Sequence, residues 1–204
     1  EPDDTLDIIP DFIEKQNKEN RGALRGSAVH LAMQCLPFAD ALTYVDAGEK
    51  ALSEWLNGQL ALLQQAGRME EAMFELIRIP MLTGFYTSNL AKRMMQADER
   101  GELFREKAFV LGVPAKEIWD CDSEELVLVQ GIVDAFFYEG DEIVIMDYKT
   151  DSVENERQLL ARYKTQLDLY AKALQEATGK RVKEKIIYYE DELNDEFSTA
   201  KIIP

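Results

Sequence analysis

Apolar and polar residues alternate with different periods in the two halves of the chain. From Asp7 to about Met95, apolar residues recur at spacings of three and four, which indicates amphipathic helices. After Gly101 the pattern changes to short runs of Val, Ile and aromatic residues separated by glycines, which is typical of strands. The sequence therefore predicts a helical lobe over residues 1–100 and a strand-containing core over residues 101–204.

The helical half divides into several shorter helices. Gly22 and Gly26 are expected to interrupt the first helical stretch, and Ser27 is a suitable N-cap for the helix that follows. Pro37 is expected to end that second helix, because proline cannot continue the hydrogen-bond pattern. The expected helices span about residues 9–20, 28–36, 46–66, 69–79 and 87–97.

The second half predicts strands on either side of one long helix. Leu160, Leu167 and Leu174 lie a heptad apart and mark the apolar face of this helix, which Gly179 is expected to end. Glycines and turn residues separate the apolar runs that read as strands. The expected strands span residues 104–111, 126–138, 143–148, 185–190 and 197–203, and the helix spans residues 154–177.

The dipeptide Gly140-Asp141 separates two of these strands and predicts a two-residue hairpin turn of type II′. With that turn, Asp134 lies directly opposite Asp147, and the Cβ atoms of such a pair are about 4.5–5.5 Å apart. If the turn is shifted back by one residue, Asp134 pairs with Ile145 and the two acids become diagonal neighbours. The first register therefore predicts two carboxylates on one face of the hairpin.

The opposed carboxylates indicate a site for a divalent cation. Like charges directly across a strand pair destabilise the sheet, and a cation bound by hard oxygen ligands removes this repulsion. Lys149 follows Asp147 by two residues and therefore points to the same face. The alternative is a surface turn in which Asp147 and Lys149 are simply solvated.

Three further polar residues are candidates for the same site. Gln166 and Tyr170 are four residues apart on the predicted helix, so both border its apolar face. The alternative for this pair is a boundary tyrosine beside a solvated glutamine. His30 is the only histidine of the chain, and a packed or surface role is the alternative for it. If its helix packs across the hairpin, His30 adds one imidazole nitrogen to the two carboxylates.

The charge balance limits the classes of partner. The chain has 39 acidic and 23 basic residues, and its formal net charge of −16 argues against a polyanionic partner. Residues 157–185 are the exception, with eight basic and three acidic residues. This stretch either contacts a DNA backbone, with Arg157, Arg162 and Lys164 as the first candidates, or forms a solvated helix face.

Cysteine usage and hydropathy limit the compartment and the cofactors. Cys35 and Cys121 are far apart and form no CxxC pair, which excludes a structural zinc site and a four-cysteine iron–sulfur cluster. A reducing compartment, hence a cytoplasmic location, is the simplest interpretation. No apolar run reaches the roughly 18–20 residues of a membrane span, so no membrane partner is expected. The start at Glu1, without an initiator methionine, suggests a segment of a longer polypeptide.

Five motifs occur in one order along the chain, and together they resemble those of the RecB-family nucleases of the PD-(D/E)XK superfamily. Within that superfamily the resemblance is strongest to the C-terminal nuclease domain of AddA/RexA helicase–nuclease subunits. The motifs are Gly26-Ser27-Ala28-Val29-His30, Arg105-Glu106, Gly131-Ile132-Val133-Asp134, Asp147-Tyr148-Lys149-Thr150-Asp151 and Gln166-x-x-x-Tyr170.

The resemblance implies an α/β (α+β) fold: a restriction-endonuclease-like core with a mixed central sheet flanked by helices, plus the helical lobe. It also implies roles for individual residues. The implied metal ligands are His30, Asp134, Asp147 and the backbone carbonyl of Tyr148. The remaining implied roles are catalysis for Lys149, support of the site and of the DNA for Gln166 and Tyr170, and an accessory acid for Glu106.

The function implied by the resemblance is Mg²⁺-dependent hydrolysis of DNA, as the exonuclease domain of an ATP-dependent helicase–nuclease in double-strand-break repair and recombination. Mn²⁺ is expected to substitute for Mg²⁺, and Ca²⁺ to bind without supporting catalysis. The expected partners are single-stranded DNA ends delivered by a helicase motor and an AddB/RexB-type subunit. Two alternatives stay open: a stand-alone single-strand DNA exonuclease, and a catalytically inactive module that binds DNA or a partner.

Overall fold

The computed structural model describes residues 11–149, 156–191 and 196–202. Helices come first: α1 (Asp11–Cys35), α2 (Phe38–Ala47), α3 (Glu49–Gln65), α4 (Glu71–Phe74), α5 (Ile79–Thr87) and α6 (Asn89–Glu99). The strands are β1 (Leu103–Pro114), β2 (Leu126–Glu139), β3 (Glu142–Lys149), β4 (Arg181–Asp191) and β5 (Glu196–Ile202), with α7 (Glu156–Thr178) between β3 and β4. The motif residues Thr150 and Asp151, and the expected strand end at Ile203, lie outside the described residues.

The five strands form one mixed sheet in the order β1-β2-β3-β4-β5. Neighbouring strands run antiparallel, except that β3 and β4 are parallel. Parallel neighbours require a crossover connection, and α7 provides it. The predicted α+β fold with a mixed central sheet is therefore confirmed.

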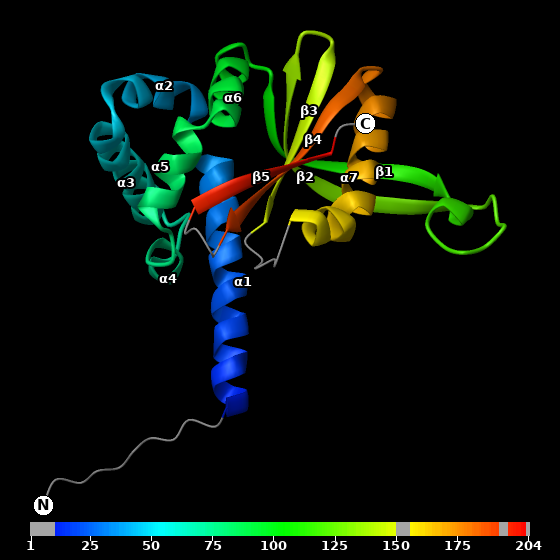
Figure 1. Cartoon of the computed structure of the whole chain (residues 1–204), viewed down its shortest axis with the longest axis horizontal. Helices are drawn as coiled ribbons and strands as arrows, with labels where there is room; N and C mark the ends of the chain where they lie inside the picture. The colour runs from blue at the N-terminus through cyan, green and yellow to red at the C-terminus, as the bar shows by residue number, and fades with distance from the viewer. Residues whose placement is uncertain (1–10, 150–155, 192–195, 203–204) are drawn as a thin grey trace, which may run out of the picture.

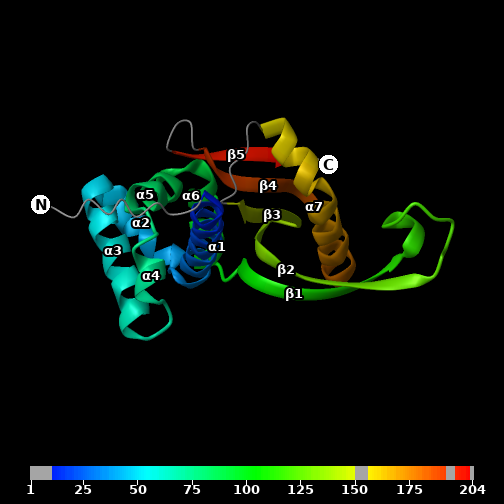
Figure 2. The same ribbon diagram turned by 90° about the horizontal axis from the view of Figure 1, so that it is seen from below.

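The helical lobe and α7 cover opposite faces of the sheet. Val144, Met146 and Tyr148 of β3 pack in a core shared with α1–α6, whereas the alternating Ile143 and Ile145 pack with α7. Figures 1 and 2 show α1–α6 gathered on one side of the strands and α7 on the other. The lobe and the sheet thus share one continuous core, and any residue at their junction depends on both.

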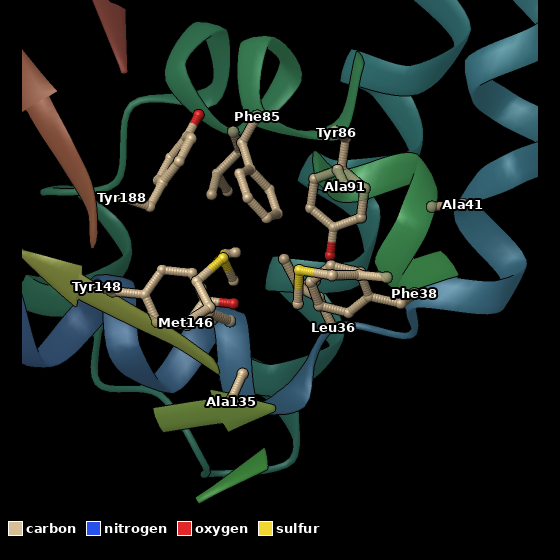
Figure 3. Close-up of a cluster of buried hydrophobic side chains, with 14 of the residues drawn as sticks. Leu36, Phe38, Ala41, Phe85, Tyr86, Ala91, Ala135, Met146, Tyr148 and Tyr188 are labelled. Atoms are coloured by element: carbon tan, nitrogen blue, oxygen red, sulfur yellow. The ribbon is translucent and has the colours of Figure 1, made fainter. Parts of the chain in front are cut away.

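Aromatic rings make up much of this junction (Figure 3). Phe85 of α5 meets Tyr188 of β4 and Tyr148 of β3 edge to face, with ring centroids 4.6 and 6.2 Å apart. Tyr86 stacks on Phe38 at the start of α2 with a centroid distance of 5.1 Å. Such rings bury large apolar areas, so they fix the position of the lobe relative to β3.

Helix α1 runs without a break through Gly22 and Gly26, so the predicted interruption is wrong. An interior glycine costs only about 1 kcal/mol relative to alanine, and burial of the C-terminal half of α1 against the sheet offsets that cost. Ser27 is not an N-cap: its hydroxyl donates to the carbonyl of Ala23 within the helix, at 3.1 Å. One continuous helix therefore leads to His30.

Other lobe predictions were correct in type but not in boundary. Gly48, with φ of 101°, separates α2 from α3, where a single helix from residue 46 was expected. The expected helix over residues 69–79 is reduced to α4, and α5 begins where that helix should have ended. Helix α5 carries Pro80 in its first turn and is buried on most sides, so it has no amphipathic pattern to recognise.

The strand and long-helix predictions are confirmed with shifts of a few residues at most termini. Leu167 and Leu174 lie on the buried face of α7, and Leu160 of the same helix packs beside them, as the heptad spacing predicted. Gly179 has φ of 70° at the end of α7, a conformation that favours glycine. Within the described residues, no helix is both long and apolar enough to span a membrane.

Candidate metal centre and active site

The hairpin of β2 and β3 has the predicted turn and register. Gly140 has φ of 64° and Asp141 does not have a positive φ, which fits a type II′ turn. Glu139 pairs with Glu142, and the pairing continues to Ala135 opposite Met146. The next position in this register is Asp134 opposite Asp147. The alternative pairing of Asp134 with Ile145 is wrong, because Ile145 pairs with Phe136.

A third acid extends this row onto β1. Arg105 pairs with Ala135 and Lys107 pairs with Val133, so Glu106 lies across from Asp134. Glu106 has φ of 51°, the one positive φ of a non-glycine residue in the described part of the chain. Such a conformation is unfavourable for a residue with a side chain and often occurs at functional sites.

The strand alternation changes phase at the same position. Val133 packs in the core on the α7 side, whereas Ala135, two residues later, packs in the core on the lobe side. In a regular strand these two side chains would share a face. The carboxylate of Asp134 lies between them, and its Oδ2 accepts a hydrogen bond from the backbone N–H of Tyr148 at 2.9 Å. The irregularity thus turns Asp134 toward the end of β3.

His30 reaches this point from helix α1. Its Nε2 lies 3.1 Å from the carbonyl oxygen of Tyr148, and its Nδ1 lies 3.5 Å from Oδ2 of Asp134. A neutral imidazole has only one N–H, so one of these two contacts joins a ring lone pair to an oxygen lone pair. Either a second ring proton or a cation relieves that contact. The donor arrangement therefore suits a metal ion.

His30, Glu106 and Asp134 form a possible ligand group. Each offers one nitrogen or oxygen atom, and these atoms lie within 4.8 Å of one another. Burial and then the Asp134 carboxylate raise the pKa of Glu106, while His30 opposes them. Carboxylate and carbonyl oxygens with one imidazole nitrogen are ligands that suit Mg²⁺ or Mn²⁺. The residues present therefore fit a hard divalent cation.

Asp147 lies beside this group but faces different partners. It is fully buried, and its Oδ2 lies 2.7 Å from Nζ of Lys149. That ion pair lacks the angles of a good hydrogen bond, and Oδ2 accepts no other within the described residues. Burial and the Asp134 carboxylate raise the pKa of Asp147 to about 6, and Lys149 only partly opposes this. An added cation near Asp147 would remove this destabilisation.

Helix α7 supplies the residues on the other side of Asp147. The amide Nε2 of Gln166 lies 3.4 Å from Oδ1 of Asp147 and also donates to the hydroxyl of Tyr170. Burial raises the pKa of Tyr170 to about 12, so its phenol is neutral at physiological pH. The two residues border the buried face of α7, and the helix spacing had predicted that position.

Sequence reasoning missed one residue that lies next to Lys149. Tyr163 of α7 lies with its ring centroid 4.6 Å from Nζ of Lys149. Tyr163 precedes Gln166 by three residues and Tyr170 by seven, so all three lie on one helical face. That spacing was the available signal, and it was used for Gln166 and Tyr170 alone.

The basic stretch expected to contact DNA is largely paired with the chain's own acids. Lys164 and Lys185 both bind Asp168, at 2.5 and 2.7 Å. Arg157 and Arg162 are exposed near the start of α7. Further ion pairs of the stretch join Lys172 to Glu117, Lys180 to Asp141, Arg181 to Glu142 and Lys183 to Glu139. Most of the local positive charge is therefore neutralised within the domain.

Comparison with known proteins gives a consistent match over nearly the whole chain. The sequence profile of the PD-(D/E)XK nuclease superfamily matches residues 6–201. Among curated relatives, the ATP-dependent helicase/nuclease A subunit of Lachnoclostridium phytofermentans is 34% identical over 216 residues, covering 88% of this chain and 15% of the relative.

Two further relatives carry the same name. The protein of Desulforamulus reducens is 36% identical over 184 residues, covering 88% of this chain and 14% of the relative. That of Syntrophomonas wolfei is 34% identical over 195 residues, covering 93% and 15%. The chain thus spans about one seventh of the length of the curated relatives it matches.

Proposed function

This chain belongs to the PD-(D/E)XK nuclease superfamily, and from that premise we propose that it is a nuclease domain like that of the helicase/nuclease A subunits and hydrolyses DNA phosphodiester bonds with a divalent cation. One observation carries the proposal. Donor atoms of His30, Asp134 and Glu106 and the carbonyl of Tyr148 converge beside a buried Asp147–Lys149 ion pair. A solvated surface turn would not bury Asp147 or raise its pKa.

The cation is proposed to be Mg²⁺, with Mn²⁺ as a substitute and Ca²⁺ as a non-catalytic competitor. Its proposed ligands are His30, Asp134, Asp147 and the carbonyl of Tyr148, and Glu106 is an additional acid at the same group. When bound, the cation polarises a phosphoryl oxygen and lowers the pKa of a coordinated water. The side chains of the site bring the charge and the geometry that hold it.

Lys149 is the proposed catalytic lysine. Its ammonium is held against Asp147 and only 15% of its side chain is exposed, so it is fixed beside the carboxylates. In phosphodiester hydrolysis, negative charge develops on the oxygens of the reacting phosphate, and a fixed ammonium group stabilises that charge. The same group can orient the attacking water by donating a hydrogen bond to it.

Gln166 and Tyr170 are proposed to support the site. The amide of Gln166 links the carboxylate of Asp147 to the phenol of Tyr170. This link restrains Asp147 on the side away from Lys149. Tyr170, whose phenol stays protonated, can also donate a hydrogen bond to a DNA phosphate. Loss of either side chain should lower the rate of cleavage clearly while changing the free energy of unfolding only slightly.

The wider context of the proposed activity rests on the relatives. We propose that the chain is the exonuclease domain of a cytoplasmic helicase–nuclease that acts in double-strand-break repair and recombination, paired with an AddB/RexB-type subunit. An acidic domain with net charge −16 has a low intrinsic affinity for DNA, and delivery of single-stranded ends by a motor would compensate for this. Arg157 and Arg162 remain the proposed DNA contacts. Lys164 would have to exchange Asp168 for a phosphate.

The decisive experiment is cleavage of end-labelled single-stranded and double-stranded DNA by the 204-residue chain with Mg²⁺, Mn²⁺, Ca²⁺ or EDTA. Asp134→Ala and Lys149→Ala should abolish cleavage while circular dichroism and melting temperature confirm folding. Wild-type cleavage by both variants would refute the assignment. Binding of DNA without cleavage by the wild-type chain in any metal would favour the catalytically inactive module.

A further inference from the structure

The ammonium of Lys149 lies between two groups of different chemistry. On one side is the carboxylate of Asp147, with Oδ2 at 2.7 Å, and on the other is the ring of Tyr163, with its centroid at 4.6 Å. A cation over the face of a tyrosine ring is attracted by the ring's negative quadrupole. Asp147 alone would leave the flexible lysine chain free to swing about one contact. The ring adds a second point of restraint.

Helix α7 provides this restraint from the same face that carries the other supporting residues. Tyr163, Gln166 and Tyr170 occupy positions i, i+3 and i+7, so they follow one another along one side of the helix. Tyr163 faces Lys149, Gln166 faces Asp147, and Tyr170 holds Gln166. The three residues thus restrain the two polar side chains at the end of β3, Lys149 and Asp147, directly or through one another.

We propose that Tyr163 is a positioning residue, which holds the ammonium of Lys149 at the scissile phosphate through the face of its ring. The inference rests on the proposed nuclease function. A lysine has four rotatable side-chain bonds, and a displacement of about 1 Å at a reacting centre can cost on the order of a hundredfold in rate. The ring therefore acts on kcat through Lys149 and is not a proposed ligand of the divalent metal ion.

The same ring also lies near a second cation. The guanidinium carbon of Arg162 is 5.3 Å from the ring centroid of Tyr163, but Arg162 is exposed and next to it in sequence. Lys149 is closer to the ring and mostly buried, so its interaction with the ring is less screened by water. Removal of the Tyr163 ring should therefore disturb Lys149 more than Arg162.

The test compares Tyr163→Leu, which removes the ring, with Tyr163→Phe, which keeps the ring and removes the hydroxyl. Tyr163→Leu should lower kcat about tenfold or more with little change in KM, and Tyr163→Phe should stay within about twofold of wild type. Mn²⁺ affinity, measured by calorimetry, should change less than twofold in both variants. Tyr163→Met carries the same expectation as Tyr163→Leu if the leucine variant does not fold.

Tyr138 provides a matched control. Its ring also lies under a lysine, with Nζ of Lys180 at 5.0 Å from the centroid, but the pair is at the far end of the β2–β3 hairpin. Tyr138→Leu removes the same type of contact and should leave kcat within about twofold. An equal loss of kcat in Tyr138→Leu and Tyr163→Leu would assign the effect to general destabilisation and overturn the proposal.

An activity-independent measurement separates this inference from the proposed function. The ring current of Tyr163 should shift the ε-methylene proton resonance of Lys149 upfield in EDTA, with the signal assigned by Lys149→Arg. The shift should persist in Tyr163→Phe and vanish in Tyr163→Leu. A shift that is lost without any fall in kcat refutes the positioning role alone, whereas a wild-type chain that never cleaves refutes the nuclease function. Equal losses in the Phe and Leu variants assign the role to the hydroxyl and also refute the inference.

Discussion

Glu106 lies across from Asp134 on neighbouring strands and adopts a left-handed backbone conformation, with φ of 51°. This conformation costs a non-glycine residue about 1–2 kcal/mol. The carboxylate of Glu106 lies close to that of Asp134, and these like charges repel each other. The domain therefore stores both backbone strain and electrostatic repulsion at the proposed metal site.

Replacing Glu106 by glycine should stabilise the metal-free domain by about 1 kcal/mol, because glycine adopts a positive φ without steric strain and the strain removed exceeds the larger entropic cost of ordering glycine. Glu106→Ala is the matched control, since it removes the carboxylate and keeps the strain. Urea unfolding in EDTA measures both variants. Equal stability of the alanine and glycine variants would show that the backbone is not strained. Both variants should lose cleavage activity.

Gly131→Ala should lower kcat several-fold and destabilise the domain by about 1–3 kcal/mol. A Cβ at this position would lie 2.9 Å from the ring of Phe109, which packs edge to face on Tyr170. Displacement of Phe109 would therefore reach Tyr170 and its partner Gln166.

Gly112→Ala on the same pair of strands is the control for that substitution. Its Cβ would meet Leu126 at an ordinary distance of 3.7 Å, and it should be close to neutral. Steady-state kinetics and thermal melts of both variants decide the matter. A Gly131→Ala enzyme with wild-type kcat would mean that the contact between Phe109 and Tyr170 does not restrain the site.

Asp147→Asn should stabilise the metal-free domain at neutral pH by on the order of 1 kcal/mol. The pKa of Asp147 is raised from 3.8 to about 6 in the folded state, so folding favours the protonated form. The stability that this group contributes is fully present below pH 3.8 and is lost as the pH rises through 6. The gain from asparagine should thus grow between about pH 4 and pH 6 and stay level at higher pH, as measured by melting in EDTA.

Asp168→Asn should have the opposite sign. Burial raises the pKa of Asp168, but hydrogen bonds from Lys164 and Lys185 outweigh burial and hold this pKa below its usual value. Its contribution is present at neutral pH and is lost as the pH falls, so asparagine should destabilise the domain at about pH 7.5 and less so in acid. A common sign for both substitutions would contradict the electrostatic account of the site.

His30→Ala should weaken Mn²⁺ binding by at least about tenfold in calorimetry, because it removes the one nitrogen donor of the group. Lys149→Ala should bind Mn²⁺ at least as tightly as wild type, since it removes a positive charge that neutralises Asp147. If His30→Ala leaves the affinity unchanged, His30 is a packing residue and the metal ligands lie on the strands alone.

The strand half of the fold was predictable because its signals are local. Gly140-Asp141 fixed the hairpin register, and the heptad leucines fixed the buried face of α7. In the lobe, packing outweighed local propensity. Gly22 and Gly26 lie within one helix whose residues from Ala28 onward are buried in the core shared with the sheet, whereas Gly48, at a positive φ, lies between two helices.

The site shows the same division. Strand periodicity predicted that Asp147 and Lys149 share a face, and helix periodicity predicted the same for Gln166 and Tyr170. The hairpin register predicted Asp134 across from Asp147, but not the change of strand phase at Asp134. No local pattern could reveal that Glu106 adopts a left-handed conformation, because that depends on its partner strand. Nor could the sequence show that Asp168 binds two lysines of the basic stretch, one of them from β4.

The junction between α1 and the sheet also bears on when the domain can become reactive. His30 is translated more than a hundred residues before Asp134 and Asp147, and the helix that carries Gln166 emerges later still. A nascent chain that ends before β2 holds the imidazole without the carboxylates of Asp134 and Asp147, and a proteolytic cut between α6 and β1 places the imidazole and these carboxylates in separate fragments. Such pieces lack the full ligand group, so the domain gains its complete metal centre only once synthesis and docking of the lobe are finished.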